Sequence, residues 1–363
     1  MNYKRFHVLQ LYFVLGISTI WSMPTMGQFA DTTKTCLTQC CKSDLSPVGM
    51  MINHVHPKRK FMFSYRYMSM GMNKKLSGTR PINDGEVYVD YLMSPQQMRM
   101  DMHMLMAMYG LSHKITLMAM VNYNFLTMNM TMLPIASMGN MMHSGHTHAE
   151  NMNMAMNTAG VGDIKLYILY DLFNKKGNQF VISSGISIPT GNIQNTGTAA
   201  NMYANARLPY AMQLGSGSFE IAPGITWLKN VGLVSVSVQA TSIIRTNYNM
   251  VGYRLGNEIT VNAWAAYQLT DWLSTSLRTE GTIIGKMQGI DPMLYTGNEP
   301  AANIYNYGGE KVNVYGGINL YMNHKLMRNN KFSIEYGIPV YQNLNGIQSA
   351  LTSTLFAGWQ IAF

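Results

Sequence analysis

The strongest chemical signal in the sequence is a tract rich in histidine and methionine between residues 138 and 156. Imidazole nitrogens suit Cu(II) and Zn(II), and thioether sulfurs suit the softer ions Cu(I) and Ag(I). The candidate metal ligands are His143, His146, His148, Met141, Met142, Met152, Met154 and Met156. A solvated loop without a bound ion is the alternative, because no spacing in the tract fixes a coordination geometry.

Two other groups of residues have side chains that could carry out chemistry. Cys36, Cys40 and Cys41 predict one disulfide and a leftover thiol in an oxidising compartment, with a thiolate metal site as the alternative. The neighbouring His143 and Ser144 lack an oriented third partner that would make the serine a nucleophile. We therefore expect no enzyme and no required cofactor, while Cu(I), Cu(II) or Ag(I) are candidate ligands.

The N-terminus carries an export signal. Lys4 and Arg5 precede an apolar stretch, Val8 to Trp21, which has the length of a signal-peptide core and is too short to span a bilayer. Small residues at Thr25 and Gly27 predict cleavage before Gln28. We expect a signal peptide over 1–27, a periplasmic segment with the cysteines over 28–58, and one domain over 59–363.

Period-two patterning dominates that domain. Charged residues make up 12% of the chain and mean hydropathy is −0.03, as expected when one face of each strand meets lipid and the other meets water. The expected strands are 61–72, 97–109, 114–128, 160–172, 179–189, 217–228, 233–246, 254–269, 272–286, 311–322, 331–341 and 353–363. The fold class is therefore all-β, a transmembrane antiparallel barrel of 12 strands, or of 14 if residues 86–93 pair separately.

The last segment sets the expected location and partners. Leu355, Trp359, Ile361 and Phe363 share one face and end the chain on an aromatic residue. This ending is typical of strands that the outer-membrane barrel assembly machinery recognises. We expect outer-membrane lipids and that machinery as partners. The net charge of +9 is scattered along an exported chain and does not indicate nucleic acid.

Charged side chains predict the face of each strand that lines the lumen, because a charge on the lipid face near mid-membrane costs about 2 to 4 kcal/mol. The expected lumen-lining residues are Arg66, Arg99, Asp101, His103, Asp163, Lys165, Glu258, Arg278 and Glu280. Both signs occur, which favours a structural network over an ion-selective pore. Twelve strands predict a narrow pore for a small solute, unless residues 28–58 or a loop plug it.

The same rule orients the methionines. Met98 to Met108 alternate with Arg99, Asp101 and His103, so we expect this ladder to face lipid. Neighbouring strands would turn the other way and place Met62, Met68, Met70, Met118 and Met120 in the lumen, near His103. There they would either pack as flexible apolar side chains or bind a soft ion.

Three stretches carry a resemblance to a known family. They are Met98 to Gly110, Gly160 to Tyr170, and Gly185 to Gly191, read together with Arg207 to Gly217. From about residue 60 onward the chain resembles the transporter-like outer-membrane barrels named after a phenol meta-cleavage (MetA) pathway protein. The resemblance implies a channel for small, often aromatic or hydrophobic, solutes. A metal-handling barrel is the alternative function.

Overall fold

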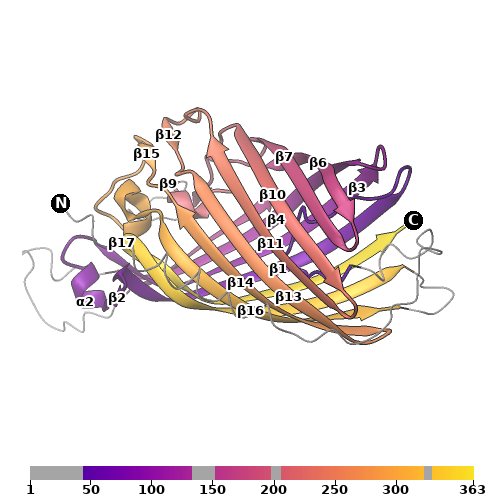
Figure 1. The fold of residues 1–363 in the computed structure, drawn as a ribbon. Helices are drawn as coiled ribbons and strands as arrows, with labels where there is room; N and C mark the ends of the chain where they lie inside the picture. Colours follow the sequence, from indigo (N-terminus) through magenta and orange to yellow (C-terminus); the bar gives the residue numbers. More distant parts are fainter. Residues whose placement is uncertain (1–43, 133–151, 198–205, 323–328) are drawn as a thin grey trace, which may run out of the picture. The chain divides into compact units, whose positions relative to one another are not determined.

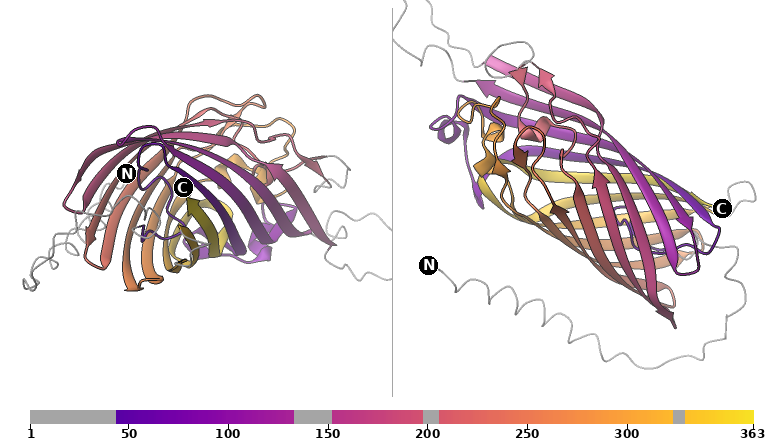
Figure 2. Two further views of the ribbon diagram at one scale, coloured as in Figure 1. Left: turned by 90° about the vertical axis from the view of Figure 1, so that its right-hand side faces the viewer. Right: turned by 90° about the horizontal axis from the view of Figure 1, so that it is seen from above.

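A closed antiparallel sheet forms the body of the protein in a computed structural model that describes residues 44–132, 152–197, 206–322 and 329–363. Eleven long strands make the ring, and pairing of β17 with β1 closes it (Figures 1 and 2). They are β1 (Phe61–Gly78), β3 (Met93–Gly110), β4 (Ile115–Met132), β6 (Ile164–Lys175), β7 (Asn178–Ile188), β10 (Glu220–Val231), β11 (Val234–Arg245), β13 (Glu258–Thr270), β14 (Leu273–Ile284), β16 (Gly309–Tyr321) and β17 (Asn330–Ala362). Two strands outside the ring, β2 (Arg80–Pro81) and β5 (Met152–Val161), pair with β1 and β4.

The last strand of the ring has two different neighbours. Residues Lys331 to Leu344 of β17 pair with β16, and residues Leu344 to Ala362 pair with β1. The expected segments 331–341 and 353–363 both lie in this element, and the connection expected between them is part of it. Gly346 takes a positive φ of 61° between the two parts, a conformation that glycine adopts without steric cost.

The sequence prediction missed one strand. Residues 152–159 were expected in a loop and 160–161 at the start of the strand 160–172, yet residues 152–161 form β5, which pairs with the half of β4 from Tyr123 to Met132. The other half of β4 pairs with β6. Asparagine, threonine and glycine in β5 resemble loop composition, but pairing with a long neighbour overrides that preference. Residues 84–87, which overlap the start of the segment 86–93 considered for separate pairing, form helix α2 (Asp84–Val87) behind an Asn83 capping box.

The two ends of the ring differ. One end, here called the short-turn end, carries tight connections such as Lys176–Gly177 and Gly232–Leu233. The other, the long-loop end, carries β8 (Thr196–Gly197), β9 (Ala206–Arg207), β12 (Tyr253–Arg254), β15 (Gln288–Gly289) and the 3-10 helices η2 (Tyr210–Met212), η3 (Pro300–Ala302) and η4 (Ile304–Asn306) (Figure 1). None of the helices in the described ranges is long and apolar enough to cross a membrane.

Side chains alternate between an apolar outer face and two kinds of inner wall. The polar wall consists of inward serine, threonine, asparagine and glutamine side chains on β10, β11, β13, β14 and β16, among them Ser237, Gln239 and Asn319. The methionine wall consists of the inward side chains of β1, β3, β4 and β5, where Met62, Met106 and Met128 are buried.

Two inward tyrosines lie flat on glycines of the neighbouring strand. A Cβ added at Gly337 would overlap the Tyr315 ring, and one added at Gly185 would overlap the Tyr167 ring. The Arg278 guanidinium carbon lies 3.8 Å from the centre of the Tyr315 ring on its inner side. The Tyr315 ring therefore joins the barrel wall to the charged groups of the lumen.

We predict that Gly337→Val lowers the free energy of unfolding by about 1 to 3 kcal/mol, because an added side chain displaces Tyr315 from its packed position. Urea titration followed by tryptophan fluorescence measures this. The matched control is Gly316→Val, because an added Cβ there meets nothing within 4 Å. Equal effects of the two substitutions would contradict a specific role for the Tyr315–Gly337 contact.

Candidate functional site

The lumen holds a segment of the chain itself. Residues 44–60, here called the plug segment, precede β1 and contact strands all around the ring. Gln239 donates a hydrogen bond to the Met51 carbonyl at 2.9 Å, Arg66 donates to the Met50 carbonyl at 2.7 Å, and the His56 amide donates to Thr116 at 2.8 Å. The part of the expected periplasmic segment that the structure describes therefore lies inside the barrel.

An ion pair fixes the start of the plug segment. The Lys331 ammonium contacts the Asp44 carboxylate at 3.1 Å and donates to the carbonyls of Asp44 and Ser46 at 2.9 Å each. Burial alone would raise the pKa of the Asp44 carboxyl, but Lys331 and His54 outweigh burial and hold that pKa below its ordinary value. Asp44 is therefore charged in the seated plug.

A second group of charged residues fixes the middle of the plug segment. Arg278 is buried and donates to Glu335, Asn262 and Glu280, each at 2.8 Å. The second oxygen of Glu335 accepts a hydrogen bond from the Gly49 amide at 2.8 Å. A Cβ added at Gly49 would lie 2.6 Å from that carboxylate, so only glycine fits this position without a shift.

A cavity of about 450 Å³ remains in the lumen toward the long-loop end. Met72, Met98, Met100 and Met128 line one side, and the lining is mainly apolar. Polar groups on the other side include Arg245, Glu258, Asn306 and Gln348. The cavity is large enough for a small molecule and offers few groups to orient it.

Inward-folded loops cover the cavity. Tyr210 and Ala211 of η2, with Pro300 and Ala301 of η3, are part of its lining. Burial raises the pKa of the nearby Glu299 carboxyl to about 8, so this group is mainly neutral at pH 7. The cover therefore presents mostly uncharged groups.

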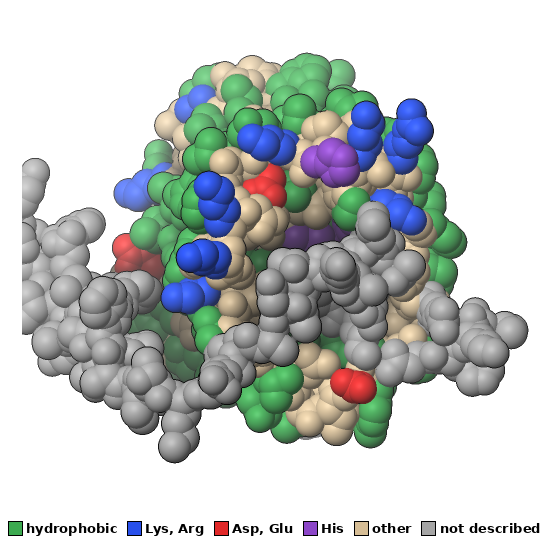
Figure 3. Space-filling view, turned by 45° about the vertical axis from the view of Figure 1, so that its right-hand side comes forward, with side chains coloured by type: hydrophobic (Ala, Val, Ile, Leu, Met, Phe, Trp, Pro, Cys, Tyr) green, Lys and Arg blue, Asp and Glu red, His purple; other side chains and the backbone are tan. Residues whose placement is uncertain are grey.

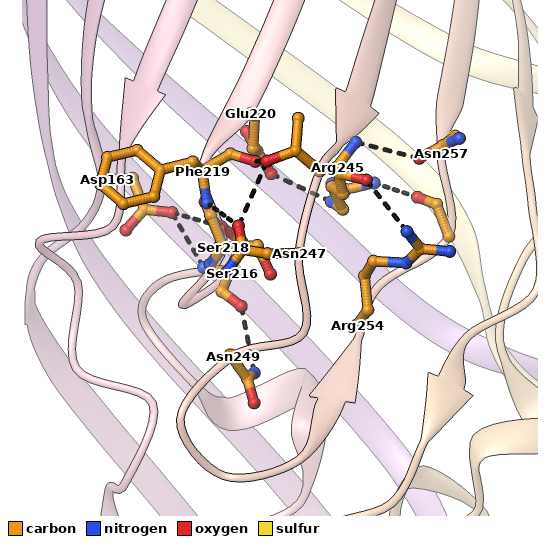
Figure 4. Close-up of polar contacts among 12 residues, drawn as sticks. Asp163, Ser216, Ser218, Phe219, Glu220, Arg245, Asn247, Asn249, Arg254 and Asn257 are labelled. Carbon is orange, nitrogen blue, oxygen red and sulfur yellow. Dashed lines mark hydrogen bonds and ion pairs between the residues drawn. The ribbon is translucent and has the colours of Figure 1, made fainter.

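Hydrogen bonds attach this cover to the barrel wall. Asp163, between β5 and β6, accepts a hydrogen bond from the Gly191 backbone amide at 2.9 Å. It also accepts one from the Ser216 backbone amide at 2.8 Å, and the Asn249 side-chain amide donates to the Ser216 carbonyl at 3.2 Å (Figure 4). Arg245 pairs with Glu220 at 3.0 Å in the same region. These contacts hold loops that are far apart in the sequence.

Most of the expected lumen-lining residues face inward. Arg66, Asp163 and Arg278 are buried, Glu258 lines the cavity, and Glu280 accepts from Arg278 and from Tyr315. Lys165 lies in phase with the inward Tyr167 and Leu169 on β6. The structure does not gather these residues into one site, because Arg278 and Glu280 hold the plug side while Glu258 faces the cavity.

Arg99, Asp101 and His103 contradict the prediction, because they lie on the outer face of β3. Arg99 pairs with Asp101 at 2.8 Å and its side chain is 56% exposed. Tyr67 donates to Asp101 at 2.6 Å, and the Tyr65 hydroxyl lies 2.7 Å from His103 Nδ1.

Depth explains this error. Arg99 is 11 residues from Gly110, the short-turn end of β3, whereas β6, β10 and β11 have only 12 residues each. Arg99 thus lies where the shorter strands end, and the cost of an outward charge falls there. Leu105 and Tyr109, on the same face as Arg99, were the signal that would have oriented the strand correctly.

The methionine ladder is reversed for the same reason. Met98, Met104, Met106 and Met108 are buried in the lumen rather than exposed to lipid. Met62, Met118 and Met120 also face inward, as expected, so three adjacent strands present thioethers on one wall. His103 is not part of it.

The predicted metal tract is only partly described. His143, His146, His148, Met141 and Met142 lie outside the described residues, as do Cys36, Cys40, Cys41 and the expected signal peptide. The side chain of Met152 is also outside them. Met156 is buried and Met154 packs against the same cluster, so the end of the tract joins the methionine wall.

We predict that Gly49→Val unseats the plug segment without unfolding the barrel, because the added side chain meets the Arg278–Glu335 pair. Single-channel conductance in a planar bilayer should rise by a factor of about two or more, since a ring with more than eight strands encloses more space than side chains alone fill. Gly281→Val is the matched control, because an added Cβ there meets nothing within 4 Å. Unchanged conductance of Gly49→Val would contradict the role of the plug.

Acid should also release the plug. Burial, together with His54, lowers the pKa of His56 from 6.5 to about 3. A released His56 with its ordinary pKa binds a proton more readily, so seating is favoured above pH 6.5 and weakens as pH falls toward 3. Protonation of Asp44 acts in the same direction at lower pH. Conductance should rise between pH 6.5 and 4, and His56→Gln should reduce the rise. A pH-independent conductance would contradict this prediction.

Comparisons with known proteins agree with this architecture. No family model matches the sequence, and no curated protein matches it. The crystal structure of the COG4313 outer membrane channel from Pseudomonas putida F1 superposes with a TM-score of 0.58 at 14% identity, covering 88% of this chain and 100% of that one. The NanC porin gives a TM-score of 0.41 at 7% identity, covering 82% and 98%. The protein therefore has the fold of outer-membrane β-barrels, and its strand-built wall with an apolar outer face places it in the bacterial outer membrane.

Proposed function

We propose that the protein is an outer-membrane channel for a small, largely apolar solute, which occupies the cavity beside the methionine wall. The observation that carries the proposal is the cavity of about 450 Å³, in which thioether side chains outnumber charged groups. Methionine is flexible and polarisable, so it adapts to solutes of different shape and favours contacts with aromatic rings.

The strand count supports a narrow passage, because twelve strands lie between the eight whose interior side chains fill and the about 16 to 18 that leave a wide channel. In a ring where every neighbouring pair is antiparallel, the number of strands must be even, and each pairing around this ring is antiparallel. Counting the two parts of β17 separately turns eleven into twelve. Hydrogen bonds from the Ala362 amide to Asn329 and from Trp359 to Asn330 join those two parts, as in a hairpin.

The orientation in the membrane follows from the two ends. Outer-membrane barrels have short periplasmic turns and longer external loops, so the short-turn end faces the periplasm. That end is rich in basic side chains, including Lys58, Arg59, Lys114, Lys175 and Lys176, all exposed (Figure 3). Basic residues at this level meet the phosphates of the inner leaflet.

The resemblance to the phenol meta-cleavage family supports the same class of solute. That family is put forward for small aromatic or hydrophobic molecules, and the apolar lining fits them better than sugars. In this proposal the solute enters from the long-loop end and meets the plug segment on its way to the periplasm. Displacement of the plug is then the gating step.

Uptake of the fluorescent apolar probe N-phenylnaphthylamine by cells producing the protein tests this function. We expect the cavity-filling variant Ala301→Trp to slow uptake by about tenfold, because the indole takes up space that the solute needs. The matched control is Ala107→Trp, which adds the same side chain on the outer face of β3.

Folded barrel is quantified for each variant by its heat-modifiable migration in gels. Slower uptake with Ala301→Trp and unchanged uptake with Ala107→Trp is the expected result. Uptake that is equal in both variants and in cells lacking the protein would contradict the channel function, as would a protein that passes glucose but not the apolar probe.

A further inference from the structure

Four methionines form one row across four adjacent strands. The register pairs Met72 of β1 with Met98 of β3, Met98 with Met128 of β4, and Met128 with Met156 of β5. Directly opposed residues in antiparallel strands have Cβ atoms about 4.5 to 5.5 Å apart. The thioether has three rotatable bonds, so the sulfurs of neighbouring members of this row can meet at one point.

Methionine is kept off the lipid face of the same strands. Each methionine of β1, β3 and β4 occupies an inward position, while outward positions carry other apolar residues such as Phe63, Leu105, Leu117 and Phe125. If methionine served only as an apolar filler, it would suit the lipid face equally well. The separation indicates that sulfur is needed where it faces the lumen.

The charge around the cavity favours a cation. Met72, Met98 and Met128 line it, and Glu258 lies in the same lining. The other charged residue there, Arg245, pairs with Glu220 at 3.0 Å. Within the described part of the chain, no basic side chain forms an ion pair with Glu258, so one carboxylate remains to attract a positive ion.

We propose that the row Met72, Met98, Met128 and Met156 is a binding site for a soft monovalent cation, Cu(I) or Ag(I), inside the lumen. Neutral thioether ligands in low coordination number select such ions over Zn(II), Ca(II) and Na⁺, which prefer nitrogen or oxygen. This site does not require the apolar solute of the proposed channel, and it uses none of the residues outside the described ranges.

A second row provides a built-in comparison. Met62, Met108 and Met118 are also paired across three strands and are buried. None of the three lines the cavity of about 450 Å³, and Met51, Ile52 and Val55 of the plug segment pack against their cluster. This row therefore has paired thioethers that lie away from that cavity and pack against the plug segment.

The test is titration of Ag(I) into the detergent-purified full chain in chloride-free buffer, with the heat of binding measured by isothermal titration calorimetry. We compare Met98→Leu/Met128→Leu with the matched control Met108→Leu/Met118→Leu, because leucine keeps volume and apolarity while removing sulfur. Any binding by residues 133–151 is equal in both. We expect the cavity-row variant alone to lose one equivalent of Ag(I), or to bind it about tenfold or more weakly.

Peroxide footprinting of the unchanged protein gives an independent reading. Bound Ag(I) should protect Met98 and Met128 from oxidation to the sulfoxide, measured by mass spectrometry, while Zn(II) should not. Equal Ag(I) binding by both variants, equal loss in both, or no protection at Met98 and Met128 would overturn the proposal. Uptake of the apolar probe is measured separately, so failure of the metal site leaves the channel function testable on its own.

Discussion

The pairing of β1 with β17 is the constraint on which the rest of the structure depends. A bilayer offers no water to satisfy strand edges, so a sheet crosses it only when its first and last strands meet. Here the register runs from Met62 opposite Ala362 to Gly78 opposite Leu344. Closure forces side chains to alternate between lipid and lumen, and it encloses a space wider than side chains alone fill. The plug segment and the folded loops occupy most of that space.

Much of the architecture was predictable from the sequence, because alternation, short turns and a terminal aromatic residue are local patterns. The rule that charged side chains face the lumen predicted the inner face correctly for Arg278 and Glu258. It failed at Arg99, because the cost of an outward charge depends on depth and a single strand does not reveal its depth. The partners of the plug segment were not predictable, since Gly49 and Glu335 are 286 residues apart.

The two parts of the lumen, the plug side and the cavity side, differ in chemistry as well as in position. Hydrogen bonds from the polar wall, from the charges around Arg278 and from Arg66 hold the plug, whereas the part of the methionine wall that lines the cavity offers soft, adaptable contacts. The contacts on the plug side therefore fix one arrangement of the plug segment, and the contacts on the cavity side tolerate solutes of different shape. The channel proposed above would hold its own segment firmly and release a solute easily, and this division suits both tasks.

The covalent link between the plug segment and β1 has a kinetic consequence. His56 and Phe61 are five positions apart, so a displaced plug remains close to the mouth of the barrel. Such a short tether gives an effective concentration on the order of millimolar. In the proposed gating step the plug would rebind as an intramolecular ligand, and a free competitor would have to exceed that concentration to keep the passage open. The lifetime of the open state is then a property of the chain itself, set by the tether rather than by the abundance of any partner.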